Sequence, residues 1–369
     1  MAWPADAQRF MRRALELAAG ARGLTSPNPM VGAVVVRDGV IVGEGLHHRA
    51  GAAHAEIDAL ARAGELARGA TLYVTLEPCS HHGRTPPCAA AVIAAGVTHV
   101  VAPGPDPNPL VSGRGFAALR SAGVEVSTGL LAVEAETLNR IFITAMRRGR
   151  PHVTLKVGMT LDGKIADVQG TSRWITGEMA RRHAHRMRAE SDAIIAGAAT
   201  VLRDNPRLDV RLPEPWPREP YRVVLDSAGR TPVDASVIHA GDPSRALIAV
   251  TPTAPRDRVQ ALRSAGASVL EVPGPDGRVD AAALLSLLFQ REVRAVLVEG
   301  GGEVHASFLD AGLVDRVAFF VAPILLGGRG AAPAVGGAGR ALKDAVRLAS
   351  MTVTTLGVDL LVEADVVRD

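Results

Sequence analysis

The chain has 369 residues, 47% of them hydrophobic and 3% aromatic, with a formal net charge of +3. That length predicts two domains, and the weak positive charge favours small anionic substrates over nucleic acid. No stretch reaches the roughly 18 uncharged apolar residues that span a bilayer, and the N-terminal "MAWPADAQRFMRRALELAAG" lacks the apolar core of a signal peptide. We expect a cytoplasmic protein whose two cysteines serve thiol or metal chemistry rather than a disulfide.

Strands and helices alternate through the first part of the chain. Residues 6–20 predict an amphipathic helix, and residues 31–45 predict a hairpin that turns at Asp38-Gly39. The remaining segments are a helix at 54–63, a strand at 70–76, a helix at 88–95, a strand at 97–102, a helix at 114–122 and a strand at 124–127. This order predicts an α/β layered domain.

A second α/β set follows a helical stretch at 130–150 that ends in the basic joint "RRGRP". Valine-rich segments begin at "HVTLKVGMTLDGKIA" and close with "VRLASMTVTTLGVDLLVEADVV", which predicts a terminal hairpin. We therefore predict two domains, at residues 1–146 and 150–369.

The motif "HAEIDAL" and the run "LEPCSHHGRTPPC", which holds both cysteines, form a metal-binding pattern. A catalytic zinc site uses three protein ligands and leaves the fourth position to water, and His54, Cys79 and Cys88 supply three. In mid-helix the side chains of His54 and Glu56 would diverge by roughly 200°. At the first turn of a helix, however, both can face one cavity.

H-x-E followed by P-C and a second cysteine is the signature of zinc deaminases, in which the glutamate moves protons and is not a ligand. Glu56 is therefore the candidate catalytic residue. Cys88 should begin a helix, where the macrodipole favours a thiolate. Nucleic-acid and nucleoside deaminases have P-C-x-x-C, whereas here "SHHGRTPP" separates the cysteines, and its polar side chains could contact a substrate phosphate.

Over nearly its whole length the sequence resembles the bifunctional riboflavin-biosynthesis deaminase–reductases. The resemblance rests on "PNPMVGAVVV", "GEGLHHRAGAAHAE", "VTLEPCSHHGRTPPC" and "DPNPLVSGRG", and later on "LKVGMTLDGKIA", "SRWITG", "AIIAGAATVLRDNPRLDVR" and "VEGGGEVHASFLDAGLVDR". It implies a cytidine-deaminase-like three-layer α/β/α domain followed by a dihydrofolate-reductase-like α/β domain. It also implies deamination of a 2,5-diamino-6-(5-phosphoribosylamino)pyrimidinone, followed by NADPH-dependent reduction of its ribosyl group to ribityl.

In the deamination that the resemblance implies, zinc lowers the pKa of its bound water from 15.7 toward roughly 7. Glu56 takes the water's proton, delivers it to a ring nitrogen and then protonates the departing amine. Asn28 would hold the pyrimidine, although an N-P turn would explain the same residue.

No G-x-G-x-x-G occurs in the chain, so a Rossmann fingerprint gives no support for a dinucleotide. Instead "VLVEGGGEVHASFL" predicts a strand, three glycines and a helix, whose N-terminus attracts a pyrophosphate. A tight strand-to-helix turn would explain the same glycines.

The resemblance also implies the binding residues of the reductase half. The NADPH site would comprise Gly158, Trp174, Thr200, Asp204, Gly301, Gly302, Glu303, Val304, His305, Ala306 and Ser307. The substrate would meet Ser172, Arg188, Leu208, Arg211 and Glu299, with Lys156 as a further contact or a solvent-facing lysine. The two arginines suit a phosphate, because guanidinium forks match its oxygens.

Two other functions remain open. A nucleic-acid editing deaminase would need an aromatic-rich surface for stacking bases, and the chain has only two tyrosines, seven phenylalanines and three tryptophans. A zinc-stabilised binding protein without turnover would need four protein ligands, to which His81 or His82 could contribute. We expect a small phosphorylated aminopyrimidine as substrate, no nucleic-acid or membrane partner, and a homo-oligomer.

Overall fold

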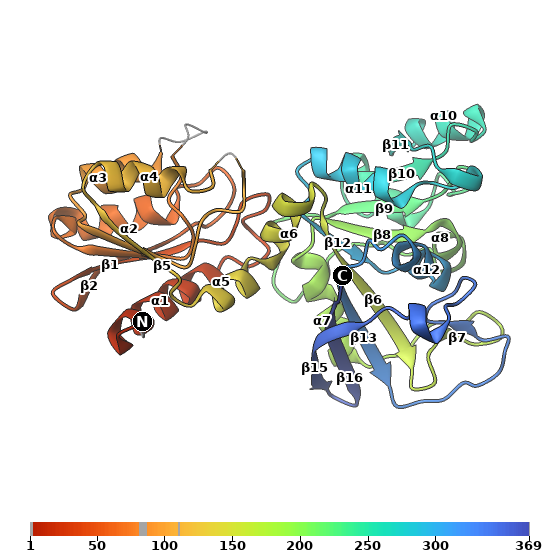
Figure 1. Cartoon of the computed structure of the whole chain (residues 1–369). Coiled ribbons are helices and arrows are strands. Elements are labelled where there is room, and N and C mark those ends of the chain that lie inside the picture. The colour runs from red at the N-terminus through yellow and green to blue at the C-terminus, as the bar shows by residue number, and fades with distance from the viewer. Residues whose placement is uncertain (1–2, 81–86, 110, 369) are drawn as a thin grey trace. The chain divides into compact units, whose positions relative to one another are not determined.

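A computed structural model describes residues 3–80, 87–109 and 111–368 of the chain. The chain divides into two compact units, Met1–Gly149 and Arg150–Asp369, and each is an α/β structure (Figure 1). Within the described residues, no helix is both long and apolar enough to cross a bilayer.

The first unit is built on a five-stranded sheet. Its strands, in spatial order, are β2 (Val40–Leu46), β1 (Gly32–Arg37), β3 (Thr71–Val74), β4 (His99–Ala102) and β5 (Glu125–Thr128). The hairpin β1–β2 and the pair β1–β3 are antiparallel, and the last two pairs are parallel. The strand and hairpin predictions for this half are confirmed.

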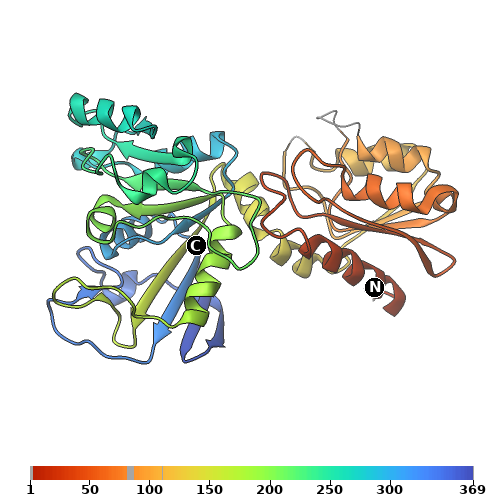
Figure 2. The ribbon, with the colours of Figure 1, turned by 180° about the vertical axis from the view of Figure 1, so that it is seen from behind.

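Helices cover both faces of this sheet, as Figures 1 and 2 show. They are α1 (Ala5–Ala19), α2 (Ala55–Ala63), α3 (Cys88–Ala94), α4 (Arg114–Ser121), α5 (Ala132–Leu138) and α6 (Arg140–Arg148), with a short 3₁₀ helix at Gly64–Ala67. Ala33 and Val35 of β1 pack in one buried cluster with α2, α3 and α4, whereas Val34 and Val36 pack with α1. The alternation of side chains along a strand thus produces the three layers that were predicted.

The helical stretch predicted at 130–150 is interrupted at Asn139, between α5 and α6. The buried Asn139 amide accepts a hydrogen bond from the Met30 N–H and donates one to the Met30 carbonyl, both at 2.8 Å. The side chain that breaks the helix therefore fixes the loop between α1 and β1.

The second unit contains a nine-stranded sheet. Its strands, in spatial order, are β11 (Ser268–Glu271), β10 (Ala246–Val250), β9 (Tyr221–Leu225), β8 (Ala193–Gly197), β12 (Ala295–Val298), β6 (His152–Thr160), β13 (Arg316–Ala322), β16 (Asp359–Val366) and β15 (Leu348–Leu356). The strands from β11 to β13 are parallel, and β15 and β16 form the predicted terminal hairpin. Strands β7 (Lys164–Ala166) and β14 (Ala332–Pro333) pair separately.

The helices of this unit are α7 (Glu178–Ala189), α8 (Ala198–Asp204), α9 (Ser236–His239), α10 (Arg256–Ser264), α11 (Ala281–Gln290) and α12 (Gly302–Asp310), with 3₁₀ turns at Pro243–Arg245, Pro275–Gly277 and Leu342–Asp344. Two buried clusters lie on opposite faces of the parallel strands. Ile195 packs in the cluster that includes α11 and α12, while its neighbour Ile194 packs in the cluster that includes α9 and α10.

The second unit is anchored at its first residue. The Arg150 guanidinium makes two hydrogen bonds to Asp315, at 2.8 and 2.9 Å. The same carboxylate accepts the Val153 N–H at 2.8 Å and lies 3.0 Å from Arg368. Arg150 lowers the pKa of Asp315 although burial raises it. The carboxylate therefore joins both ends of this unit to the end of the loop before β13.

Candidate active sites

Three side chains with metal-binding atoms meet in the first unit. The potential ligand atoms of His54, Cys79 and Cys88 all lie within 4.8 Å of one another. His54 Nδ1 is 3.1 Å from Cys88 Sγ and 3.7 Å from Cys79 Sγ. These are the three residues that the sequence assigns to zinc.

The local fold explains how they meet. His54 is the N-cap of α2 and has an extended backbone, so its side chain does not follow the helical spiral that Glu56 joins. Cys79 follows β3, and Cys88 is the first residue of α3. The Cys88 N–H donates to Cys79 Sγ at 3.3 Å, which ties the two sulfur positions together.

The residues fit a zinc ion. Tetrahedral zinc with bonds of about 2.0–2.3 Å requires neighbouring ligand atoms to lie roughly 3.3–3.8 Å apart. The observed N–S separations are close to this range, and one imidazole with two sulfurs is a usual zinc donor set. Among the described residues no fourth histidine, cysteine or carboxylate joins the group, and His81 and His82 lie outside those residues.

The two thiols differ in acidity. A hydrogen bond from the Cys88 thiol, assisted by His54, lowers the pKa of Cys79 to about 4 despite its burial. The same hydrogen bond, burial and the nearby Glu56 raise the pKa of Cys88.

Glu56 is buried next to this group, with 3% of its surface exposed. Burial raises the pKa of Glu56 to about 7, although His54 and a hydrogen bond with Cys88 oppose the shift. A carboxyl group with such a pKa can both accept and release a proton near neutral pH.

Asn28 lies in the loop that Asn139 anchors. Its Nδ2 is 3.0 Å from Nε2 of His47, and the His47 ring makes a T-shaped pair with the ring of the zinc-ligand candidate His54, with ring centroids 5.4 Å apart. The structure thus places Asn28 near the metal-binding group. His47 could not be distinguished from the adjacent His48 by sequence, because both precede an irregular loop that has no periodic pattern.

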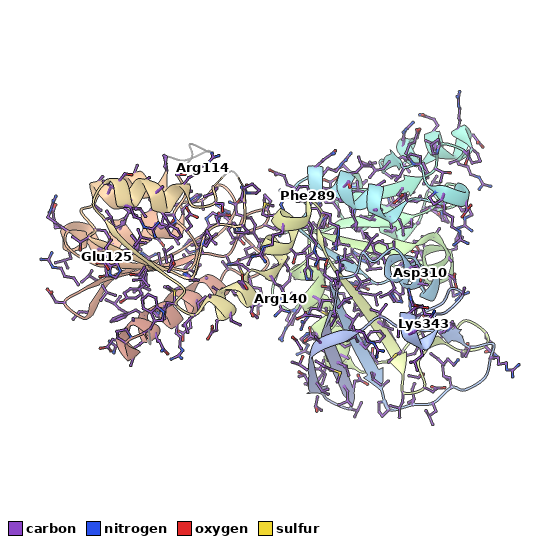
Figure 3. The ribbon with its side chains drawn as sticks, viewed as in Figure 1. Arg114, Glu125, Arg140, Phe289, Asp310 and Lys343 are labelled. Carbon is purple, nitrogen blue, oxygen red and sulfur yellow. The ribbon has the colours of Figure 1, made fainter. Side chains whose placement is uncertain are left out.

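Glu77, two residues before Cys79, holds a long loop. Its buried carboxylate accepts the backbone N–H groups of Asp106 and Gly113 at 2.9 Å each and those of Gly115 and Phe116 at 2.8 and 3.1 Å. These donors span the motif "DPNPLVSGRG" and the start of α4, which begins at Arg114 (Figure 3). This carboxylate therefore links the segment that carries Cys79 to a loop remote in sequence.

The second unit contains a cavity of about 470 Å³. Its walls come from β6, β7, the segment 172–176, α7, the ends of β8 and β12, α8, the first turn of α12, β13 and β14. Because the carboxyl ends of parallel strands meet at one edge of a sheet, such a position is typical of ligand sites in α/β folds.

Most residues that the resemblance assigns to the reductase half line this cavity. They are Gly158, Trp174, Thr200, Asp204, Gly301, Gly302, Glu303, Val304 and His305 for the cofactor, and Lys156, Ser172, Arg188, Arg211 and Glu299 for the substrate. Three others are not part of the lining. Leu208 is buried in the apolar cluster with α9 and α10, Ala306 is buried, and the Ser307 hydroxyl bonds to the Val304 carbonyl.

A buried ionic cluster lies in the cavity wall. Arg188 makes two hydrogen bonds of 2.7 Å to Glu299 and a third, of 2.9 Å, to the Asp209 carbonyl. Burial raises the pKa of Glu299, but Arg188 and Lys156 outweigh it and hold that pKa at about 2. Burial lowers the pKa of Lys156, whose Nζ lies 3.9 Å from Glu299. One edge of the Arg188 guanidinium is therefore bound to Glu299.

His185 is a cavity residue that the sequence analysis missed. Its Nδ1 accepts the Arg211 N–H at 3.1 Å, so its Nε2 carries the proton. Burial, Arg188 and Arg211 lower the pKa of His185 to about 4. A helical signal was present, because His185 lies three residues before Arg188 on the same face of α7.

The glycine run before α12 has two roles. A Cβ on Gly300 would come within 2.5 Å of the Ala196 Cα, so packing against β8 requires this glycine. Gly301 has a φ of 63° and precedes the helix, and with Gly302 it lines the cavity. The turn explanation holds for the other two as well, because Gly301 has a positive φ and a Cβ on Gly302 would come within 2.6 Å of the Pro333 carbonyl oxygen. A ligand at the helix N-terminus is compatible with this turn, since both glycines line the cavity.

Known proteins match both halves. Residues 4–103 match the family described as cytidine and deoxycytidylate deaminase zinc-binding region, and residues 151–362 match the RibD C-terminal domain. Riboflavin biosynthesis protein RibD of Actinobacillus pleuropneumoniae is 43% identical over 96% of this chain and 94% of its own length. RibD of Escherichia coli K12 is 47% identical over 86% of this chain and 88% of its own.

Solved structures agree with these matches. A form of Acinetobacter baumannii RibD superposes with a TM-score of 0.88 at 38% identity, covering 98% of this chain and 99% of that one. A Thermotoga maritima deaminase/reductase superposes with a TM-score of 0.85 at 37% identity over the same shares. The predicted fold class is confirmed, and the chain belongs to the bifunctional RibD family of riboflavin-biosynthesis deaminase–reductases.

Proposed function

We propose that the first unit converts 2,5-diamino-6-(5-phosphoribosylamino)pyrimidin-4(3H)-one and water to 5-amino-6-(5-phosphoribosylamino)uracil and ammonia. The second unit then reduces the ribosyl group of that product to ribityl with NADPH. The grouping of His54, Cys79 and Cys88 beside the buried Glu56 carries the first assignment. The Thermotoga maritima relative is named as a diaminohydroxyphosphoribosylaminopyrimidine deaminase and 5-amino-6-(5-phosphoribosylamino)uracil reductase, which supports both.

In the deaminase unit, His54, Cys79 and Cys88 would hold zinc. When bound there, zinc supplies a Lewis acid that lowers the pKa of a coordinated water to about 7. Glu56 would accept a proton from the attacking water and deliver it to a ring nitrogen of the pyrimidine, and would then pass the second proton, from the newly bound hydroxyl group, to the departing amine. Asn28 would hold the pyrimidine edge.

In the reductase unit, the cavity would hold NADPH against the phosphorylated sugar, with hydride passing to C1′ of the ring-opened ribose. The cofactor contacts would be Gly158, Trp174, Thr200, Asp204 and the segment 301–307. The substrate contacts would be Lys156, Ser172, Arg188, Leu208, Arg211 and Glu299. Since the Arg188 fork already binds Glu299, Arg188 would chiefly orient that carboxylate, and Leu208 would act through its backbone.

We also propose domain limits of 1–146 and 150–369 and a cytoplasmic location, where reducing conditions keep both cysteines out of a disulfide and available to a metal ion. A homo-oligomer is supported by β15, an edge strand whose side chains are almost all exposed and include Leu348, Met351 and Val353. Sedimentation equilibrium should give a mass above that of one chain, and Val353→Lys should lower it.

The deaminase assignment is tested by ammonia release from the diaminopyrimidine. Glu56→Gln should abolish release while the zinc content stays unchanged, because the carboxyl group is not a ligand. Glu65→Gln, an exposed glutamate near the end of α2, is the matched control and should behave as the parent protein. Normal release by Glu56→Gln would refute the acid–base role.

The reductase assignment is tested by NADPH oxidation. Oxidation should require the deaminated product and should proceed normally in Glu56→Gln when that product is supplied. Loss of oxidation in Glu56→Gln under these conditions would contradict two independent sites.

A further inference from the structure

The loop that carries Asn28 is fixed by backbone contacts. The Asn28 N–H donates to the Thr25 carbonyl at 2.9 Å, and both backbone groups of Met30 are bound by the Asn139 amide. The side chain of Asn28 can still rotate about its last torsion, which exchanges its carbonyl oxygen and its amino group. Something other than the loop must therefore decide which of the two faces the pyrimidine.

His47 lies where it can make that choice. It is buried, with 3% of its surface exposed, and it follows β2 directly. Its Nδ1 is 3.0 Å from the Ala53 carbonyl oxygen, and its Nε2 is 3.0 Å from Asn28 Nδ2. Its backbone N–H donates to the Val31 carbonyl at 2.9 Å. The ring is therefore held by contacts at both nitrogens and at its backbone.

These contacts determine the direction of each hydrogen bond. A carbonyl oxygen only accepts, so the proton of the His47 ring must lie on Nδ1. Nε2 of the neutral ring then has a lone pair and accepts from the Asn28 amino group. A flipped Asn28 would set its carbonyl oxygen against that lone pair, which is unfavourable.

We propose that His47 is a positioning residue that fixes the polarity of the Asn28 amide at the deaminase site. With Nδ2 bound to His47, Oδ1 of Asn28 is the end left to accept a hydrogen bond from the substrate. The site therefore selects a heterocycle that presents an N–H or amine donor to this position and disfavours one that presents only an acceptor. The proposal rests on the deaminase function proposed above.

A purely structural role for His47 is the competing explanation. Its ring makes a T-shaped pair with the His54 ring, so His47 could serve only to hold that metal ligand in place. The two roles differ in their consequences. A support for His54 would change the zinc content and would act whether or not Asn28 is present.

A double-mutant cycle separates the two roles. We expect His47→Leu to lower kcat/KM for ammonia release by about 5- to 10-fold, mainly through KM, as for one misdirected hydrogen bond. In the Asn28→Ala background the same substitution should have little further effect, and zinc content should stay unchanged throughout. An equal loss in both backgrounds, or a loss of zinc, would overturn the proposal.

Two further variants serve as controls. His48→Leu makes the same substitution at the adjacent histidine, whose side chain is 59% exposed, and should leave kcat/KM unchanged. His47→Gln should recover part of the loss, because its amide oxygen can accept from Asn28. A His47→Gln variant as impaired as His47→Leu would argue against the hydrogen-bond role.

A spectroscopic measurement needs no activity. In zinc-bound protein labelled with ¹⁵N-histidine, the His47 signal should show a protonated Nδ1 and an unprotonated Nε2, assigned by its absence in His47→Gln. A proton on Nε2 would overturn the proposal. Failure of the deaminase function itself would appear instead as a parent protein that releases no ammonia from the diaminopyrimidine.

Discussion

In the deaminase unit the proposed zinc ligands lie between residues 54 and 88, whereas the reductase cavity draws its walls from residues 156 to 336. In the first site, His54 caps a helix, Cys79 follows a strand and Cys88 begins a helix, and all three lie within a short stretch of sequence. The second uses the carboxyl ends of several parallel strands and depends on the whole sheet for its shape. A short motif can therefore specify the first site, while the second exists only in the complete fold.

The sharpest test of this contrast removes one metal ligand. Cys88→Ser should lose bound zinc and lower ammonia release by roughly 10³-fold or more, since the pKa of the attacking water is no longer lowered. NADPH oxidation with the deaminated product should stay within twofold of the parent protein. A parallel loss of oxidation would show that the two sites are not independent.

The corresponding change in the reductase unit is Glu299→Ala. It leaves Arg188 and Lys156 buried without their carboxylate, so the free energy of unfolding of this unit should fall by about 3–5 kcal/mol. Calorimetry of the full chain should show the loss, together with loss of NADPH oxidation and retained ammonia release. Glu178→Ala removes a carboxylate from the exposed Arg182 pair and should change stability by less than about 1 kcal/mol.

Glu77→Gln tests how far the deaminase unit depends on the contacts of Glu77 with the backbone between Asp106 and Phe116. One end of the glutamine would direct an amino group at two backbone N–H donors, which should cost about 1–3 kcal/mol. Chemical unfolding of the deaminase unit measures this, with Glu65→Gln as the exposed control. No change in stability would mean that the loop holds its position without this carboxylate.

The smallest expected effect is a pH dependence at His185. Its pKa is about 4 in the folded protein against 6.5 in the unfolded chain, so the unfolded state binds more protons between these values. Stability should therefore fall as pH drops from 6.5 toward 4, by on the order of 1 kcal/mol because solvent screens this half-buried ring. Replacing it, as in His185→Gln, should flatten that part of the profile, and His48→Gln should not.

The sequence predicted the elements of both sheets well, because their apolar patterns have clear periods. It also singled out His54, Cys79 and Cys88, which the fold brings together, because their pattern matches the zinc-deaminase signature. It did not predict the interruption at Asn139, whose reason is a hydrogen-bond partner about a hundred residues away. Local patterns contain no information about such a partner.

The sequence predicts even less about residues that act by contacting a neighbouring side chain. Nothing in "GLHHRAG" distinguishes the buried His47 from the exposed His48, and only the fold shows which one meets Asn28. The resemblance predicts that Arg188 contacts the substrate, and only the fold shows that its Nε and one terminal nitrogen bind Glu299. Residue type predicts what a side chain can bind, and the tertiary structure determines what it does bind.

The ion pair of Arg150 with Asp315 determines where a separate fragment of the reductase half should begin. Arg150 is the first residue of that unit, yet its partner Asp315 lies at the end of the loop before β13. A fragment that begins at Pro151 would contain every strand and helix of the unit but would lack two of the donors to this buried carboxylate. A fragment of the reductase half should therefore include Arg150. A fragment that begins one residue later, at Pro151, should be far less soluble.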